Sequence, residues 1–292
     1  MATVGDWIEG ARLRTLPAAI APVILGSAGA GALDSFYWDR ALLALGVALA
    51  LQVGVNYAND YSDGIRGTDD NRTGPPRLTG GKLAAPRTVL AAAFGCFALA
   101  GVLGLLLLYL SGAWWFLIPG ILAVVAAWFY TGGKHPYGYY GLGEVMVMVF
   151  FGYLAVLGTT WTQAHAAPWW MWFAATGVGL LSADILMVNN LRDLASDKVS
   201  GKKTLAVRLG DKASRYWFIG IAMLAALSGV ITVMGARGWW GAVSAFMLFP
   251  LCWLPTIPVR RGAKGMDLVA VLKMTGIVTV VYALVVGAWL LI

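Results

Sequence analysis

Long apolar stretches separated by short polar segments make up most of this chain. An apolar stretch of about 17 to 25 residues is long enough for a helix that crosses a bilayer. The chain contains nine stretches of this kind: residues 16–32, 40–58, 88–110, 113–130, 143–160, 168–190, 216–235, 240–257 and 268–291. We therefore predict an all-α, polytopic membrane protein in which residues 1–292 form one domain, a bundle of nine transmembrane helices around a central cavity.

The composition agrees with a membrane protein. Of the 292 residues, 60% are hydrophobic and 12% are charged, and the mean hydropathy is +0.75. A soluble domain of this length could not bury so much apolar surface. Asp6 and Glu9 precede the first apolar stretch, which argues against a signal peptide. Cys96 and Cys252 both lie within predicted spans, so we expect neither a disulfide framework nor a thiolate metal site.

The basic residues predict the orientation of the bundle. Loops on the cytoplasmic side of a membrane protein are enriched in lysine and arginine. If the amino terminus is cytoplasmic, 18 basic residues fall on that side and only Arg40 and Arg237 fall on the other. Both of the polar segments described next then lie at the cytoplasmic face. The net charge of +7 reflects this topology and a site for a polyanion, so we expect no nucleic-acid binding.

Two acidic segments follow directly on predicted spans: residues 56–63, the first acidic segment, and residues 189–197, the second. An aspartate at the centre of a spanning helix costs about 2.5 to 3.5 kcal/mol, so such residues are candidates for function. At 100° per residue, the polar side chains of each segment share one side of its helix: within a 100° sector for Asn56, Asn59, Asp60 and Asp63, and within about 60° for Asn190, Asp193 and Asp197. We expect the two segments to share one cation site.

The donor atoms predict which cation binds. Carboxylate and amide oxygens are hard ligands, and His135 and His165 fall on opposite sides of the membrane, so Mg²⁺ is favoured over zinc or copper. Magnesium is usually held by one or two carboxylates together with substrate phosphates. The expected ligand is therefore a metal-bridged diphosphate or polyphosphate.

The loops after the acidic segments contain the residue types that bind phosphate. Glycines let backbone amides approach an anion, and arginine makes bidentate phosphate contacts. No Walker pattern is present, which argues against nucleotide hydrolysis. A cation or phosphate transporter is disfavoured because the acidic segments are confined to one membrane face. A third segment, residues 130–144, is rich in tyrosine and glycine, as is typical of an interfacial aromatic belt with a turn.

The motifs of the chain resemble those of the UbiA superfamily of intramembrane aromatic prenyltransferases, and most closely its branch that prenylates 1,4-dihydroxy-2-naphthoate. The resemblance spans nearly the whole chain. It rests on Arg12-Leu13-Arg14-Thr15-Leu16-Pro17, Asn56-x-x-Asn59-Asp60-Tyr61-x-Asp63-Gly64, Gly67-Thr68-Asp69, Asn189-Asn190-x-Arg192-Asp193-x-x-x-Asp197 and Gly201-Lys202-x-Thr204. Gly67 and Asn190 stand where the wider superfamily usually has aspartate.

The resemblance implies an activity. A polyprenyl group would pass from polyprenyl diphosphate to 1,4-dihydroxy-2-naphthoate, with loss of CO₂ and diphosphate, giving demethylmenaquinol in menaquinone biosynthesis. Relatives in the superfamily use other acceptors, such as 4-hydroxybenzoate or homogentisate, and these remain the alternative. The cofactor would be Mg²⁺, with Mn²⁺ as a substitute. The enzyme would lie among the lipids of a prokaryotic plasma membrane, and its oligomeric state and prenyl chain length stay open.

The resemblance also implies a role for each polar residue near the two segments. The metal ligands would be Asn59, Asp60, Asp63, Asp193 and Asp197. The diphosphate would be bound by Arg66, Arg72, Lys134, Lys202 and Arg208, with Lys134 also acting in catalysis. Residues at the metal or just behind its ligands would be Asn56, Asp69, Asn189 and Asn190. The aromatic residues facing the allylic cation or the acceptor would be Tyr57, Tyr61, Tyr137, Tyr139 and Tyr140.

Overall fold

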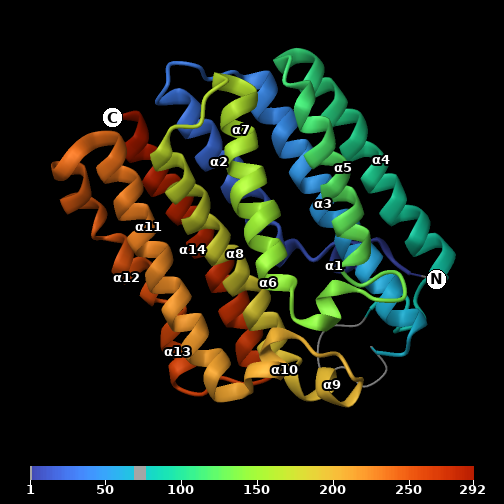
Figure 1. Ribbon diagram of the computed structural model, residues 1–292. Helices are drawn as coiled ribbons and strands as arrows, with labels where there is room; N and C mark the ends of the chain where they lie inside the picture. The colour runs from blue at the N-terminus through green and yellow to red at the C-terminus, as the bar shows by residue number, and fades with distance from the viewer. Residues whose placement is uncertain (1, 69–76) are drawn as a thin grey trace.

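The structure, a computed structural model, describes residues 2–68 and 77–292. Within these residues every regular element is a helix (Figure 1). The elements are α1 Val4–Ala11, η1 Leu13–Thr15, α2 Pro17–Gly31, α3 Trp38–Ile65, α4 Pro86–Ser111, η2 Trp114–Phe116, α5 Leu117–Phe129, η3 Tyr137–Tyr140, α6 Gly143–Val147, η4 Met148–Leu154, α7 Ala155–Ala164, α8 Trp169–Arg192, α9 Leu194–Val199, α10 Leu205–Leu209, α11 Asp211–Ala245, α12 Leu248–Trp253, α13 Thr256–Arg260 and α14 Met266–Leu291.

Six helices of the described chain are long and apolar enough to cross a membrane. They are α3, α4, the continuous helix formed by α6, η4 and α7, and then α8, α11 and α14. A seventh is added if the first two helical segments, Val4–Thr15 and Pro17–Gly31, count as one span bent by 50°. The predicted all-α, multi-pass architecture is therefore confirmed, whereas the predicted number of nine spans is not.

Two of the predicted spans take a different form. The stretch at 113–130 folds as a shorter apolar helix, Trp114–Phe129. The stretch at 240–257 is broken into short pieces: the end of α11 beyond Gly238, then α12 and α13. Gly238 interrupts α11 with φ 75° and ψ −168°, a conformation that glycine adopts readily. Pro255 precedes α13 and has no N–H group to continue the helix before it.

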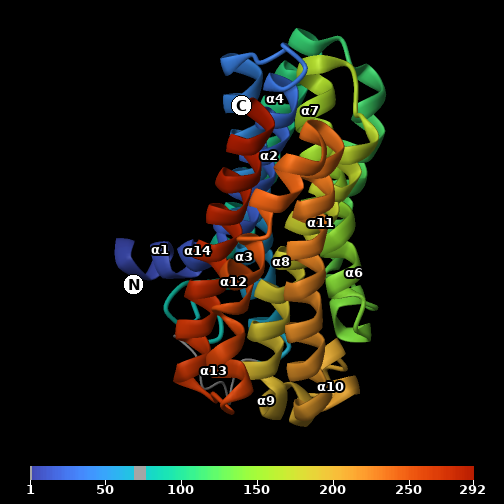
Figure 2. The ribbon, with the colours of Figure 1, turned by 90° about the vertical axis from the view of Figure 1, so that its left-hand side faces the viewer.

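The bend between the first two helical segments directs α1 away from the bundle. In Figure 2, α1 projects sideways from the long helices, and the segment Val4–Thr15 is bent by 50° from Pro17–Gly31. Arg12 ends α1 in the left-handed conformation, with φ 55°, and Pro17 begins α2 at a position where proline is favoured. The Tyr57 hydroxyl of α3 donates a hydrogen bond to the Trp7 carbonyl at 2.9 Å. These contacts fix the amino-terminal helix against α3.

Small residues allow the long helices to pack closely. Helices α2, α8, α11 and α14 surround the largest apolar core, and α3 packs along α4 on the other side of the bundle (Figure 1). A Cβ atom on Gly177 would lie 2.0 Å from the Tyr282 hydroxyl, which donates to the Ala225 carbonyl at 2.9 Å. Glycine at this position therefore lets α8 and α14 approach each other, as is common between membrane helices.

Candidate active site

Asp60 is fully buried at the end of α3 and binds the backbone of a later loop. Its two carboxylate oxygens accept hydrogen bonds from the amides of Leu78 and Thr79, at 2.9 and 2.7 Å. Hydrogen bonds from backbone amides to a carboxylate are stronger than those between neutral groups. In this structure the predicted metal ligand Asp60 thus anchors the turn that connects α3 to α4.

We expect Asp60→Ala to destabilise the protein. Loss of two charge-assisted hydrogen bonds at a buried position should lower the free energy of unfolding by about 3 kcal/mol, because the two loop amides lose their acceptor. Thermal unfolding in detergent measures the change. The matched control is Asp211→Ala, which removes a carboxylate that is 53% exposed and pairs with Arg215. An unfolding temperature for Asp60→Ala equal to that of the control would contradict this role.

Asp63, one turn further along α3, contacts two residues that lie far away in the chain. Its carboxylate accepts a hydrogen bond from the Tyr139 hydroxyl at 2.6 Å and lies 3.3 Å from the Lys202 ammonium. The Asp197 carboxylate also acts electrostatically on this ammonium group. Burial lowers the pKa of Lys202, but the Asp63 and Asp197 carboxylates outweigh it, so that the pKa lies above its usual value. The Lys202 ammonium therefore lies between influences from both acidic segments, whereas the divalent-cation site predicted for them stays a prediction.

Three segments that are far apart in the chain meet around Asp63 and Lys202, and we call them the mouth of the site: residues 59–66, 131–139 and 202–203. The Lys203 amide donates to the Tyr139 carbonyl at 3.0 Å, and the Thr131 hydroxyl donates to Asn59 Oδ1 at 2.7 Å. Arg66 donates to the carbonyls of Thr131 and Gly133. Its guanidinium also lies over the Tyr139 ring, 5.3 Å from the centroid. The tyrosine- and glycine-rich segment is therefore part of the site.

Tyr139 links the mouth to the acidic residues. Burial raises the pKa of its phenol, and the neighbouring Asp63 carboxylate raises it further. The phenol therefore stays protonated and donates to Asp63. The Lys202 ammonium lies 5.0 Å from the centroid of the same ring, a cation–π contact.

The other polar residues of the second acidic segment have separate partners. The Arg192 guanidinium donates to both carboxylate oxygens of Asp193, at 2.8 and 2.7 Å. Asn190 donates to Glu144 Oε1 at 2.9 Å. The second oxygen of the buried Glu144 has no hydrogen-bond partner within the described part of the chain. Glu144 was not among the predicted site residues, since its place next to Asn190 depends on how two distant helices pack.

Several predicted site residues lie beside the mouth or outside it. Tyr57 packs on α1, and Tyr61 stacks on Trp128 with ring centroids 6.5 Å apart. Tyr140 is exposed, and its hydroxyl lies 3.3 Å from His135 Nδ1. The remaining positions are as follows: Asn56 bonds Ala11 and Thr15, Lys134 is exposed and bonds no other described residue, Arg208 donates to the Lys203 carbonyl, Tyr137 and Asn189 line the cavity below, and Asp69 and Arg72 lie outside the described residues.

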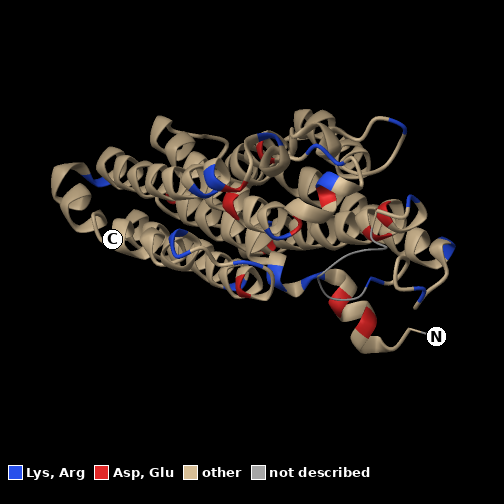
Figure 3. Ribbon diagram, turned by 90° about the horizontal axis from the view of Figure 1, so that it is seen from below, with Lys and Arg blue, Asp and Glu red and all other residues tan. Residues whose placement is uncertain are grey.

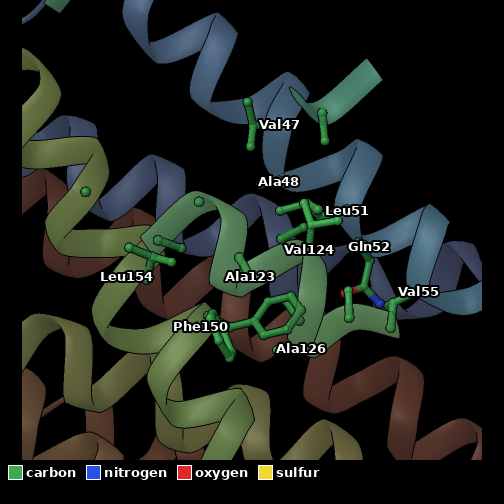
Figure 4. Close-up of a pocket in the computed structure, with 18 of the residues that line it drawn as sticks. Val47, Ala48, Leu51, Gln52, Val55, Ala123, Val124, Ala126, Phe150 and Leu154 are labelled. Carbon is green, nitrogen blue, oxygen red and sulfur yellow. The ribbon is translucent and has the colours of Figure 1, made fainter. Parts of the chain in front are cut away.

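An apolar cavity of about 510 Å³ opens beneath the mouth. Along α3 its lining extends from Asn59 to Ala44, a rise of about 22 Å at 1.5 Å per residue. In Figure 4, Phe150 projects into this space toward Ala123 and Ala126 of α5. Phe150 belongs to a π-helical segment, a local change of helix that is frequent at functional sites. The cavity is long and apolar enough for an isoprenoid chain.

The donor set at the mouth fits magnesium. Within residues 2–68 and 77–292, no three His, Cys, Asp or Glu side chains are grouped as a complete metal site. Two carboxylates, Asp63 and Asp197, do act on one buried cation, the ammonium of Lys202. One or two carboxylates completed by substrate phosphates is the usual arrangement for Mg²⁺. Asp63 and Asp197 could hold such an ion, and the wider ligand set with Asn59, Asp60 and Asp193 stays a prediction.

Comparisons with known proteins agree with this geometry. Residues 19–265 match the UbiA prenyltransferase family. The chain is 49% identical to 1,4-dihydroxy-2-naphthoate octaprenyltransferase of Mycobacterium tuberculosis, covering 98% of this chain and 97% of that protein. It is 40% identical to the Escherichia coli protein of the same name, over 83% of this chain and 82% of that protein.

Solved structures share the fold. A UbiA homologue from Archaeoglobus fulgidus bound to GPP and Mg²⁺ superposes with a TM-score of 0.70 at 13% identity, covering 97% of this chain and 99% of that one. The apo structure of a UbiA homologue from Aeropyrum pernix has a TM-score of 0.69 at 16% identity, covering 93% and 96%. An A. fulgidus homologue has also been solved with Cd²⁺. With a family match over residues 19–265 and a relative that is 49% identical over nearly its whole length, this chain belongs to the UbiA prenyltransferase family.

Proposed function

We propose that this protein transfers a polyprenyl group from a polyprenyl diphosphate to 1,4-dihydroxy-2-naphthoate, in the pathway to menaquinone. The names of the relatives at 49% and 40% identity support the acceptor. The observation that carries the proposal is the meeting of Asp63, Asp197 and Lys202 at the mouth of a long apolar cavity. A diphosphate headgroup would bind at this mouth, and its tail would extend along the cavity.

Asp63 and Asp197 would hold the metal together with the diphosphate. Bound Mg²⁺ would stabilise the negative charge that develops on the departing diphosphate. The Lys202 ammonium lies 3.3 Å from Asp63 and would donate to the phosphate oxygens. Lys134 and Arg208 are exposed beside the mouth and are candidates for binding the outer phosphate oxygens. Arg66 donates a hydrogen bond to the Thr131 carbonyl and so stabilises the turn there.

The bonds formed and broken in this reaction balance, and no base is needed to remove a proton from the ring, because CO₂ leaves in its place. The allylic C–O bond breaks, and its electron pair leaves with the diphosphate. The electron-rich ring carbon that bears the carboxylate forms the new C–C bond. The bond to the carboxylate then breaks to release CO₂, and its electron pair restores the aromatic ring. The apolar cavity wall would exclude water from the allylic cation, and the Tyr137 and Phe150 rings line the space in which that cation would form.

The acceptor can be tested directly. We expect membranes containing the protein, supplied with labelled polyprenyl diphosphate, to form a prenylated product and one equivalent of CO₂ with 1,4-dihydroxy-2-naphthoate. We expect at least about 100-fold less product with 4-hydroxybenzoate or homogentisate, because a site shaped for a fused bicyclic ring rejects a single ring that leaves part of the pocket unfilled. Preferred use of either single-ring acid would overturn the proposed acceptor.

The orientation and the domain organisation are also proposals. Viewed from the end that carries α9, α10 and α13, charged residues lie in the loops and helix ends of that face (Figure 3). The excess of lysine and arginine in these loops supports their placement in the cytoplasm, with the amino terminus on the same side. The 292 residues would act as a single prenyltransferase domain in a prokaryotic plasma membrane.

A further inference from the structure

Arg12 stands apart from the other basic residues of the site. Among the described residues it is the one charged side chain that lines the apolar cavity. The cations of the mouth, including Lys202, Arg66 and Arg208, do not line it. Arg12 therefore brings a positive charge to the side of the site where the prenyl tail and the aromatic acceptor would meet.

The backbone at Arg12 is held in an uncommon conformation. Its φ of 55° is left-handed, which non-glycine residues adopt rarely and which tends to occur at functional positions. The Arg12 amide donates to the Glu9 carbonyl at 3.0 Å. The Arg12 carbonyl accepts from the Thr15 amide at 2.8 Å and from the Thr15 hydroxyl at 2.9 Å. The turn between α1 and α2 is thus closed on both sides of Arg12.

Polar side chains of helix α3 hold this turn in place. Thr15 Oγ1 accepts hydrogen bonds from Gln52 Nε2 at 3.0 Å and from Asn56 Nδ2 at 3.2 Å. Asn56 Nδ2 also donates to the Ala11 carbonyl at 2.9 Å. Asn56, predicted to lie near the metal, therefore binds the backbone before Arg12 and the Thr15 side chain after it. Buried and satisfied hydrogen bonds of this kind hold a side chain in a defined direction.

The electrostatic surroundings place Arg12 at the boundary between mouth and cavity. Its charge acts on the Asp63 carboxylate and on the hydroxyl of Tyr130, which also lines the cavity. A group bound next to Arg12 would lie close to the headgroup site and still within apolar surroundings. The reacting ring of the acceptor needs such a place, because it must contact the first carbon of the prenyl tail.

We propose that Arg12 binds the carboxylate of the aromatic acceptor. The inference rests on the proposed function, in which the acceptor is an aromatic acid. An ionised carboxylate in an apolar cavity is unfavourable unless a cation pairs with it. The planar guanidinium matches a carboxylate through two parallel hydrogen bonds, which also fixes the orientation of the ring. The diphosphate is served by Lys202 and the metal ligands at the mouth, so it does not require Arg12.

Steady-state kinetics of Arg12→Gln and Arg12→Lys test the assignment. For Arg12→Gln we expect the KM for the aromatic acid to rise by about 30-fold or more, because the buried carboxylate loses its partner. We expect Arg12→Lys to show a smaller rise, about 5-fold, because it keeps the charge but loses the bidentate geometry. The KM for polyprenyl diphosphate should stay within about 2-fold of the wild-type value in both variants.

Arg14→Gln is the matched control. Arg14 belongs to the same turn, but its guanidinium pairs with Glu9 and does not line the cavity. Both KM values should be unchanged in this variant. Thermal unfolding of all three variants shows whether the turn stays folded, and Arg12→Lys keeps the assignment testable if Arg12→Gln unfolds.

The outcomes separate this inference from the proposed function. A rise in the KM for polyprenyl diphosphate, or no change in either KM, would overturn the role of Arg12 and leave the choice of acceptor intact. The same measurements are made with 4-hydroxybenzoate and homogentisate, which also carry a carboxylate. If the wild type prefers one of these and Arg12→Gln loses affinity for it selectively, the role of Arg12 holds while the proposed acceptor is wrong.

Discussion

Replacing Asp63 with asparagine is expected to lower kcat by about a thousandfold, which corresponds to about 4 kcal/mol of transition-state stabilisation. Asp63 is buried, lies 3.3 Å from Lys202 Nζ, and shares that cation with Asp197. Asparagine keeps the size of the side chain and can still accept the hydrogen bond from Tyr139. It cannot supply the negative charge that a divalent metal requires, so kcat should fall in protein that is still folded.

Product formation at saturating concentrations of both substrates measures this loss. Thermal unfolding of the same preparation should show one cooperative transition, at a lower temperature than the wild type because the buried Lys202 ammonium loses a carboxylate partner. Asp211→Asn provides the control, because this carboxylate is exposed at the start of α11 and binds Arg215. If Asp63→Asn retained more than a tenth of the wild-type kcat, Asp63 would not belong to the metal site.

Removal of divalent metal is the second change with a large expected effect. In EDTA, turnover should fall below about one thousandth of its rate with Mg²⁺, because the charge on the departing diphosphate would lose its main electrostatic partner. The Lys202 ammonium brings one positive charge to a group that carries two or more negative charges. Return of Mg²⁺, or of Mn²⁺ with the same preference for oxygen ligands, should restore activity.

The fold should survive this treatment. Without metal, the Lys202 ammonium still pairs with the Asp63 carboxylate in the described structure. The unfolding temperature in EDTA should therefore match that of protein from which metal was never removed. Diphosphate release at an undiminished rate in EDTA would show that the reaction needs no metal, and the roles of Asp63 and Asp197 would have to be reassigned.

Asp60 and Asp63 show what helical periodicity can predict and what it cannot. Helical periodicity placed both on one side of α3, and the resemblance assigned both to the metal. In the structure Asp60 binds amides 18 and 19 residues later in the chain, whereas Asp63 binds Lys202, 139 residues away. Helical spacing gives no information about these distant partners, and the metal role assigned to both residues stays a prediction. The two aspartates differ in which distant segment of the chain packs against each of them.

Arg12 shows the same limit of prediction from sequence. The motif from Arg12 to Pro17 was part of the family resemblance, but two arginines stand in it and the sequence offers no reason to prefer one. Arg14 pairs with Glu9, five residues away, and Arg12 lines the cavity. The difference arises from the left-handed turn at Arg12, which depends on Thr15, Gln52 and Asn56 meeting between two helices.

By itself the sequence determined the helical class, the membrane setting, the two acidic segments and the family. These properties follow from hydropathy, helical period and motif spacing, which act over a few turns of chain. The tertiary structure alone decided which carboxylates share a cation, where α11 breaks at Gly238, and which arginine reaches the cavity. Such choices depend on hydrogen bonds and charge pairs between helices far apart in the chain, and a buried polar group is satisfied by whichever partner the packing brings to it.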